Sequence, residues 1–291
     1  MKVLVTGVKG QLGHDVMNEL AKRGYEGVGV DVAEMDITDA EAVRRVMEEV
    51  RPDKMVHCAA WTAVDAAEDE TEMCRKVNAE GTENIARMCG EMDIPMIYLS
   101  TDYVFDGQGT EPWLPDCKDY KPLNVYGETK LAGELAVSEN LEKYFIVRIA
   151  WVFGKNGKNF IKTMLNLGKT HDTLTVVSDQ IGTPTYTLDL AKLLVDMIET
   201  DKYGYYHATN EGGYISWYDF TKEIFRQAIE AGHEEYAKVT VKPVTTAEYG
   251  ASKAKRPFNS RLDKSKLVEN GFQPLPTWQD AIKRYLQEIE F

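Results

Sequence analysis

A tyrosine and a lysine four residues apart, Tyr126 and Lys130, are the side chains in this sequence with the clearest potential for acid–base chemistry. On a helix this spacing places both side chains on one face. A free tyrosine has a pKa of about 10 and is a poor acid or base at neutral pH, but a nearby ammonium stabilises the phenolate and lowers that pKa. Upstream, Thr101 follows an apolar run that predicts a strand. Hydroxyl, phenol and ammonium together predict a site that polarises a carbonyl group and relays a proton during hydride transfer.

Three glycines near the start of the chain, Gly7, Gly10 and Gly13, form a Gly-x-x-Gly-x-x-Gly turn between a predicted strand and a predicted helix. Glycines there let the backbone turn sharply and approach a pyrophosphate, whose charge meets the free amides of the helix N-terminus. Asp31 follows Gly13 by 18 residues, at the end of the second predicted strand, where an acid accepts hydrogen bonds from adenosine ribose hydroxyls. The alternative for Asp31 is a solvated loop acid. The turn predicts that a nicotinamide dinucleotide binds here.

Strands and helices are expected to alternate through the first half of the chain. The pattern predicts strands at 2–6, 26–31, 54–60, 96–100 and 145–149, and helices at 11–23, 39–50, 126–140 and through 77–88. This alternation is typical of an α/β fold with a doubly wound parallel sheet of the Rossmann type. We therefore expect a dinucleotide-binding Rossmann domain over residues 1–153.

The pattern is looser after residue 153. It predicts helices at 159–169, 188–200, 216–231 and 277–290, and short strands at 173–177, 205–208 and 239–243. Because no linker composition appears, residues 154–291 are expected to form mainly a smaller, interleaved substrate-binding lobe, with segments that return to the Rossmann domain. The long polar segment 101–125 contains several aromatic residues, which favour an ordered loop with a functional role.

The overall composition excludes several classes of partner. The formal net charge of −13 argues against nucleic acid or an anionic membrane, because both need a basic face, but it allows one small anionic substrate. No run approaches the roughly 20 apolar residues of a membrane helix. The apolar start ends at Thr6, far short of a secretion signal, so a cytoplasmic location is expected. The four cysteines form no Cys-x-x-Cys pair, which fits a reducing compartment.

Several longer stretches carry a resemblance to a known family. They are Cys58-Ala-Ala-Trp-Thr-Ala-Val-Asp65, Ser100-Thr-Asp-Tyr-Val-Phe-Asp-Gly107, Pro122-Leu-Asn-Val-Tyr-Gly-Glu-Thr-Lys-Leu-Ala-Gly-Glu134, Asp179-Gln-Ile-Gly-Thr-Pro-Thr185 and Arg256-Pro-Phe-Asn-Ser-Arg261. Through them, and over nearly its full length, the chain resembles the extended short-chain dehydrogenase/reductases, and within them the nucleotide-sugar reductases. The resemblance implies that NADPH or NADH reduces the C4 carbonyl of dTDP-4-dehydro-6-deoxy-L-mannose to give dTDP-L-rhamnose, in cell-surface polysaccharide biosynthesis.

The resemblance also implies roles for individual residues. Tyr126 would donate a proton to the C4 oxygen, Lys130 would tune it and hold the nicotinamide ribose, and Thr101 would hydrogen-bond the reacting oxygen. The expected cofactor contacts are Gly7, Gly10, Gln11, Leu12, Gly13, Asp31, Asp36, Ile37, Ala60, Trp61, Thr62, Tyr126 and Lys130. The expected substrate contacts are Thr101, Asp102, Tyr103, Trp151, Arg256 and Arg261. The alternative for Trp151 is plain core, and the alternative for the two arginines is a surface position.

The resemblance leaves a metal, a dimer and the choice of cofactor open. Some family members hold a metal between subunits through carboxylates, so the resemblance allows both a bound Mg²⁺ and a homodimer. Asp15 is a candidate ligand, but apolar Leu188 stands at the later acidic position, so no metal site is placed. Asp31 disfavours the 2′-phosphate of NADPH, whereas the family accepts both cofactors.

Other functions are compatible with parts of the sequence. A dehydratase of this superfamily carries Thr-Asp-Glu after the fourth strand, and Tyr103 in place of the glutamate argues against that activity. A reductase or epimerase of another nucleotide-linked 4-keto sugar is harder to exclude. A non-catalytic regulatory subunit, like that of methionine adenosyltransferase, would bind a dinucleotide without turnover. The presence of Thr101, Tyr126 and Lys130 favours an enzyme.

Overall fold

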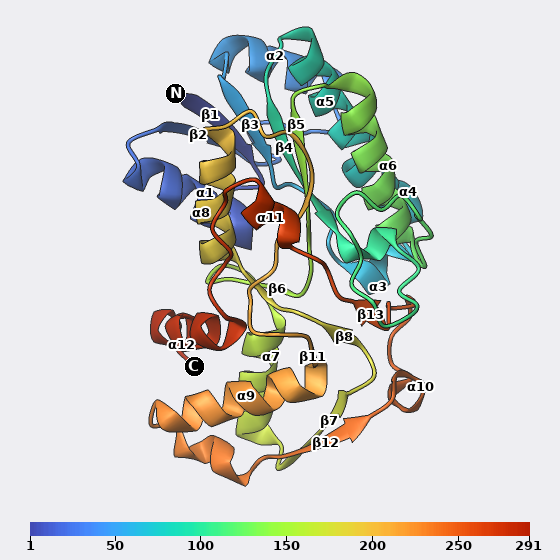
Figure 1. Ribbon diagram of the computed structural model, residues 1–291, viewed down its shortest axis with the longest axis vertical. Coiled ribbons are helices and arrows are strands. Elements are labelled where there is room, and N and C mark those ends of the chain that lie inside the picture. Colours follow the sequence, from blue (N-terminus) through green and yellow to red (C-terminus); the bar gives the residue numbers. More distant parts are fainter.

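The computed structural model describes residues 1–291 and is built around one six-stranded sheet (Figure 1). The strands of this sheet are β1 (Lys2–Thr6), β2 (Glu26–Val30), β3 (Lys54–His57), β4 (Met96–Thr101), β5 (Tyr144–Ile149) and β10 (Gly204–His207). All of them run parallel, in the order β10-β5-β4-β3-β1-β2. The chain reverses its direction of progress between β1 and β3, and such sheets bind ligands beyond the carboxyl ends of the strands at that point. The predicted doubly wound parallel sheet is confirmed.

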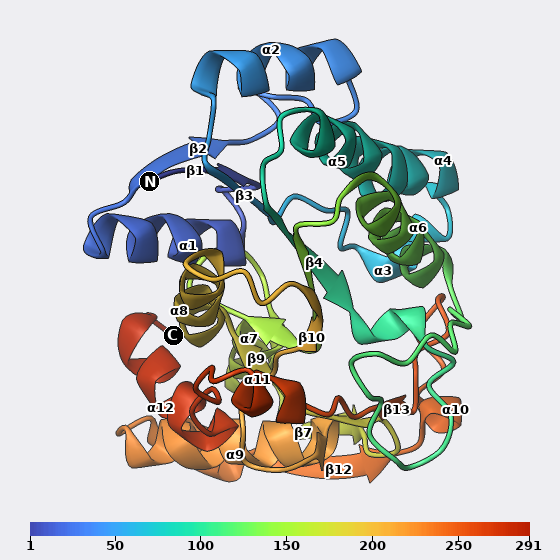
Figure 2. The same cartoon turned by 45° about the horizontal axis from the view of Figure 1, so that its top comes forward.

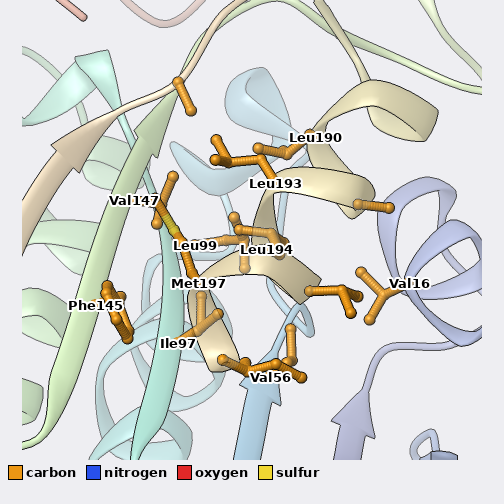
Figure 3. Packing of buried hydrophobic residues seen from close by; sticks show 14 of the residues in the cluster. Val16, Val56, Ile97, Leu99, Phe145, Val147, Leu190, Leu193, Leu194 and Met197 are labelled. Atoms are coloured by element: carbon orange, nitrogen blue, oxygen red, sulfur yellow. The ribbon is translucent and has the colours of Figure 1, made fainter. Parts of the chain in front are cut away.

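Helices cover both faces of this sheet (Figure 2). The main ones are α1 (Gln11–Lys22) and α8 (Thr187–Ile198) on one face, and α2 (Ala40–Val50), α5 (Thr82–Glu91) and α6 (Val125–Asn140) on the other. On the first face, apolar side chains of α1 and α8 are buried against strand residues such as Val56, Ile97 and Val147 (Figure 3). Burial on both faces explains why the strands read as nearly continuous apolar runs.

The second half of the chain forms a smaller lobe and also contributes to the sheet. Its helices α7 (Phe160–Thr170), α9 (Trp217–Glu230) and α12 (Trp278–Glu288) surround a separate apolar cluster that includes Phe153 and Tyr186. The parallel pair β7 (Thr173–Val177) and β12 (Thr240–Val244) lies beside this cluster. From the same half, β10 pairs with β5 and α8 packs against α1. A domain boundary at residue 153 stays a prediction.

Short elements complete the fold. They are α3 (Val64–Ala67), α4 (Thr71–Arg75), α10 (Thr246–Tyr249), α11 (Ser265–Glu269), β6 (Val152–Phe153), β8 (Ile181–Gly182), β9 (Thr185–Tyr186), β11 (Ile215–Ser216) and β13 (Asn259–Ser260). A π-helical turn spans Lys76–Gly81, and 3₁₀ turns span Asp102–Val104 and Glu234–Lys238. No helix is both long enough and apolar enough to cross a membrane.

Two predicted elements differ from the structure for local reasons. The third strand ends at His57 rather than at residue 60, because the amides of Cys58 and Ala59 donate to the hydroxyl of Thr6, each at 3.1 Å, instead of to a neighbouring strand. The helix expected through 77–88 begins as the π-helical turn. There the Asn78 side chain accepts a hydrogen bond from the backbone amide of Trp61 and donates one to the backbone carbonyl of the same residue. Turns of this kind occur frequently at functional sites.

Candidate active site

A cleft of about 990 Å³ opens beyond the carboxyl ends of the central strands. The residues predicted for the site that line it are Gly7, Gly10, Gln11, Leu12, Gly13, Asp31, Asp36, Ile37, Ala60, Thr62, Thr101, Asp102, Tyr103, Tyr126, Lys130, Trp151 and Arg256. Two predicted residues, Trp61 and Arg261, are not among the lining residues. The fold therefore brings nearly the whole predicted set together from the two halves of the chain.

The glycine turn forms the floor of the cleft between β1 and α1. Gly7 has a φ of +69°, and a Cβ there would lie 2.8 Å from the Cα of Ala59. A Cβ on Gly13 would overlap the carbonyl oxygen of Gly7 and lie 2.8 Å from its carbon. Gly10 caps α1 without a side-chain hydrogen bond, so the first amides of the helix have no side-chain acceptor. Free amides at a helix N-terminus are suited to the pyrophosphate of a dinucleotide, and these residues fit that group.

Carboxylates gather at the adenosine end of the cleft. Asp31 follows β2, and its carboxylate accepts hydrogen bonds from the backbone amides of Lys9 and Val32 at 3.1 and 3.0 Å. The Glu34 carboxylate accepts from the amide of Asp31 at 2.9 Å. Nearby Asp36 accepts from both the hydroxyl and the amide of Thr38, which lowers its pKa. This end of the cleft suits ribose hydroxyls better than a further phosphate.

Tyr126 and Lys130 lie in the first turns of α6, which is fixed at its start by Asn124. The Asn124 side chain accepts from the amide of Gly127 at 2.8 Å and caps the helix. Lys130 is 3% exposed, and its ammonium lies 4.2 Å from the centroid of the Tyr98 ring. Burial lowers the pKa of Lys130 to about 7, against an opposing influence of Glu134.

The pKa of Tyr126 does not follow the expectation from the sequence. Burial raises it above the usual value, and this effect outweighs the opposing hydrogen bond to Thr101. The prediction that the neighbouring ammonium brings this pKa down is therefore wrong, because desolvation of the phenolate dominates. The phenol carries its proton at neutral pH, which is the state that a proton donor needs.

Thr101 and Asp102 lie at the end of β4, beside the phenol. The Thr101 hydroxyl donates to the Asp102 carboxylate at 3.0 Å and accepts from the amide of Tyr103 at 3.3 Å. Asp102 is 1% exposed, and burial raises its pKa to about 6. The Tyr103 ring packs edge-on against that of Tyr126, with centroids 5.4 Å apart. The position of the Thr101 hydroxyl is thus fixed by the two residues that follow it in the chain.

Arg256 reaches the cleft from the C-terminal part of the chain. It donates to the Asp65 carboxylate at 2.7 Å and to the Tyr103 hydroxyl at 3.0 Å. Arg261, by contrast, donates to the side chain of Asn259 at 3.0 Å, and its backbone oxygen accepts from Trp113. The two arginines therefore occupy different environments, and of the two only Arg256 lines the cleft.

An aromatic pair lines another part of the cleft. Trp151 has a φ of +52° and stacks on Trp217, with ring centroids 3.7 Å apart and planes 17° apart. A non-glycine residue in the left-handed region is strained, and such strain is found at ligand sites. Trp61, the other predicted tryptophan, directs its indole N–H to the carbonyl of Ala63 at 3.2 Å.

Sequence reasoning missed several residues of the site. Trp217 and Lys158 line the cleft, and Asn78 supports it through the backbone of Trp61. Trp217 stands at the start of a helix in an amphipathic pattern, which indicates core rather than a site. Asn78 lies within a segment that reads as ordinary helix. Only the contacts between distant segments show these roles.

No metal site is formed in the described chain. No group of three or more His, Cys, Asp or Glu side chains could hold a metal ion. Asp15, the candidate ligand, is buried and accepts from the hydroxyl of Thr187 at 2.5 Å. The residues present do not fit the Mg²⁺ that the resemblance allowed.

Comparisons with known proteins decide the family. The model of the RmlD substrate binding domain family matches residues 1–291. A dTDP-4-dehydrorhamnose reductase from Escherichia coli K12 is 40% identical over 99% of this chain and 98% of its own length. The chain belongs to the dTDP-4-dehydrorhamnose reductase family. The resemblance to the nucleotide-sugar reductases is confirmed.

Solved structures of the dTDP-4-dehydrorhamnose reductase family agree with this assignment. A reductase from Bacillus anthracis, determined in complex with NADP, is 41% identical, covers 99% of both chains and has a TM-score of 0.92. One from Clostridium acetobutylicum has the same identity, coverage and TM-score. A UDP-glucose 4-epimerase from Thermus thermophilus, 20% identical with a TM-score of 0.80, shares the fold alone.

Proposed function

We propose that this member of the family reduces the C4 carbonyl of dTDP-4-dehydrorhamnose to give dTDP-L-rhamnose. The observation that carries the proposal is the meeting of Thr101, Tyr126 and Lys130 in one cleft with the glycine turn of β1 and α1. The names of relatives that are about 40% identical over nearly their whole length support the same substrate. Bound NADPH or NADH supplies the hydride.

The side chains of the cleft divide the remaining work. Tyr126, protonated because its phenol is buried, donates its proton to the C4 oxygen. The hydroxyl of Thr101, which donates its one proton to the Asp102 carboxylate in the structure, turns that proton to the same oxygen when substrate binds and so polarises the carbonyl. Lys130 holds the nicotinamide ribose and, as an ammonium, stabilises the phenolate that remains after proton transfer. Gly10, Gln11 and the other residues of the turn hold the pyrophosphate through backbone amides.

The direct test is to mix the purified protein with dTDP-4-dehydrorhamnose and reduced cofactor and to follow cofactor absorbance. We expect oxidation of the cofactor in proportion to the sugar nucleotide supplied, without a second protein. Binding of cofactor without any oxidation would instead support a regulatory subunit. Oxidation only with a different 4-keto sugar nucleotide would keep the chemistry and change the substrate.

Replacing Arg256 with methionine should weaken the binding of the sugar nucleotide. A hydrogen bond to a charged group contributes about 1.5–3 kcal/mol, so loss of this cation should raise KM roughly 10- to 100-fold. The interaction is shared by ground and transition states, so kcat should change little. The measurement is steady-state kinetics at saturating cofactor. Arg261→Met is the matched control variant. Because Arg261 does not line the cleft, KM for the sugar nucleotide should rise less in this variant than in Arg256→Met. A larger rise of KM in Arg261→Met would show that Arg261 is the cation that binds the substrate.

Asp31 should set the choice between the two cofactors in favour of NADH. A carboxylate beside the ribose repels a 2′-phosphate, and at a partly exposed site this repulsion amounts to about 1 kcal/mol. Asp31→Ala should therefore improve the affinity for NADPH relative to NADH by about fivefold. Calorimetric titration of both cofactors against both proteins measures this ratio. An unchanged ratio would mean that the carboxylate does not face the ribose.

The assembly and location of the protein stay predictions. The family resemblance leaves a homodimer open, and the sequence predicts a cytoplasmic location. Sedimentation of the purified protein at several concentrations tests the first, with a monomer at all concentrations as the contrary result.

A further inference from the structure

A buried carboxylate continues the catalytic face of α6. Tyr126, Lys130 and Glu134 follow one another at intervals of four residues, so their side chains lie along one side of the helix. Glu134 is 0% exposed and points to Arg148 of β5, which is also 0% exposed. Removing a pair of charges from water costs free energy. The presence of such a pair one helical turn after Lys130 therefore suggests a role beyond stability.

Arg148 fixes this carboxylate by using all five of its N–H donors. Nε and one terminal nitrogen donate to the two oxygens of Glu134, at 2.8 and 2.7 Å. The remaining donors reach the carbonyl of Pro115 at 3.0 Å, the hydroxyl of Tyr120 at 3.1 Å and, at 3.5 Å, the ring nitrogen Nε2 of His207. A guanidinium with every donor used cannot turn away. The Glu134 carboxylate therefore has one fixed position.

Lys130 lacks such a partner of its own. Its ammonium lies over the ring of Tyr98, and no carboxylate is within salt-bridge distance. Burial lowers the pKa of Lys130. The charge of Glu134 is the largest of the effects that raise this pKa and so oppose the lowering. The lysine is thus close to losing its proton at neutral pH, and Glu134 acts against that loss from one helical turn away.

The other groups that face Lys130 carry no charge at neutral pH. From β3 and the residue after it, burial lowers the pKa of His57 to about 3 and raises that of Cys58 to about 12. Burial also raises the pKa of the Cys74 thiol of α4 and of the phenols of Tyr98 and Tyr126. Glu134 is therefore the one negative charge among the groups that act on this ammonium.

We propose that Glu134, held in place by Arg148, is a positioning residue that keeps Lys130 in its ammonium form. The inference rests on the proposed function, because the ammonium is needed only where Lys130 holds ribose and stabilises a phenolate. The buried ion pair of Glu134 and Arg148 would then act in catalysis through Lys130, although neither residue lines the cleft. It also links segment 101–125, through Pro115 and Tyr120, to the helix that carries the catalytic pair.

The first test needs no turnover. In cofactor-free protein labelled with ¹³C-lysine, the Cε resonance of Lys130, assigned by its loss in Lys130→Arg, is followed against pH. In Glu134→Gln its titration should move to lower pH by at least about one unit, the lower limit for removing a close charge. An unmoved titration would overturn the proposal, whatever the activity of the variant.

A double variant guards against unfolding. Glu134→Gln leaves Arg148 buried without its partner, which destabilises the fold. Glu134→Gln/Arg148→Met removes both charges and should fold, with a Lys130 titration that still moves to lower pH but by less than in the single variant. If the double variant titrates as the wild type does, the pair has no net effect on Lys130 and the proposal fails.

Kinetics then separate this role from a structural one. Because Lys130 acts as the ammonium, kcat falls as pH rises through the pKa that Lys130 has in the enzyme–substrate complex, and Glu134→Gln should move this fall to lower pH, in the same direction as the NMR titration. A purely structural defect would lower kcat equally at all pH values. Tyr120→Phe, which removes one contact of Arg148 without changing charge, should leave the pH profile unmoved. Absence of turnover in the wild type would contradict the proposed function, while the NMR result would still decide the link between Glu134 and Lys130.

Discussion

Tyr126→Phe should lower kcat at least about 100-fold, because general acid catalysis by a positioned side chain contributes about 10²–10⁴-fold. The ring of Tyr126 packs against that of Tyr103, and phenylalanine preserves this contact. The affinity for NADH or NADPH should therefore stay close to that of the wild type. Steady-state kinetics at saturating cofactor, combined with a cofactor titration, measure both quantities.

Tyr103→Phe is the matched control for this experiment. It removes a phenol from the same cleft, together with the hydrogen bond that Arg256 donates to it, but it removes no proton donor to the C4 oxygen. We expect its effect on KM for the sugar nucleotide rather than on kcat. A Tyr126→Phe enzyme with nearly normal kcat, or a Tyr103→Phe enzyme with the larger loss of kcat, would assign the proton donor elsewhere.

Gly13→Ala should abolish tight cofactor binding. The added Cβ would overlap the carbonyl oxygen of Gly7 and lie 2.9 Å from the Cα of Val8, and both are backbone atoms that cannot turn aside. The turn must open, which displaces the amides of the α1 N-terminus from the pyrophosphate. Losing one or two hydrogen bonds to a charged group, at about 1.5–3 kcal/mol each, should weaken NADH binding by between about tenfold and about 10⁴-fold. Calorimetry on the folded variant, with its circular dichroism compared to wild type, measures this loss.

Gly10→Ala tests whether the loss comes from the turn itself. A Cβ on Gly10 would meet only the carbonyl oxygen of Gly7, at 3.2 Å, so the turn should keep its shape. We expect a smaller loss of affinity than for Gly13→Ala. Equal losses would indicate that any side chain in the turn blocks the ligand directly and that the backbone of the turn does not need to open.

The central fold follows from local patterns in the sequence. Apolar runs bounded by Gly7, Gly24 and Pro52 predict β1, β2, α1 and α2 to within a few residues, because strands covered on both faces need continuous apolar side chains. The carboxyl ends of parallel strands lie at one edge of the sheet. The glycine turn after β1, Thr101 at the end of β4 and the pair Tyr126 and Lys130 at the start of α6 are therefore predicted to meet there. The structure brings these residues together in one cleft.

Other features of the fold and of the site depend on contacts between distant segments of the chain, and no local sequence pattern predicts them. The two-residue strands β8, β11 and β13 exist only because they pair with one another. Arg256 and Arg261 are indistinguishable in the sequence, and the fold alone turns the first toward Asp65 and Tyr103 and the second toward Asn259. Burial around Tyr126, which reverses the expected direction of its pKa, likewise results from side chains contributed by several elements.

The most direct test of the central claim follows the hydride itself. The purified protein is incubated with dTDP-4-dehydrorhamnose and reduced cofactor carrying deuterium at the transferred position, and the sugar product is examined by NMR. Reduction at C4 predicts dTDP-L-rhamnose with one deuterium on C4 and one oxidised cofactor for each sugar formed. An isomerised sugar without net oxidation of the cofactor, or a product without deuterium at C4, would contradict the account.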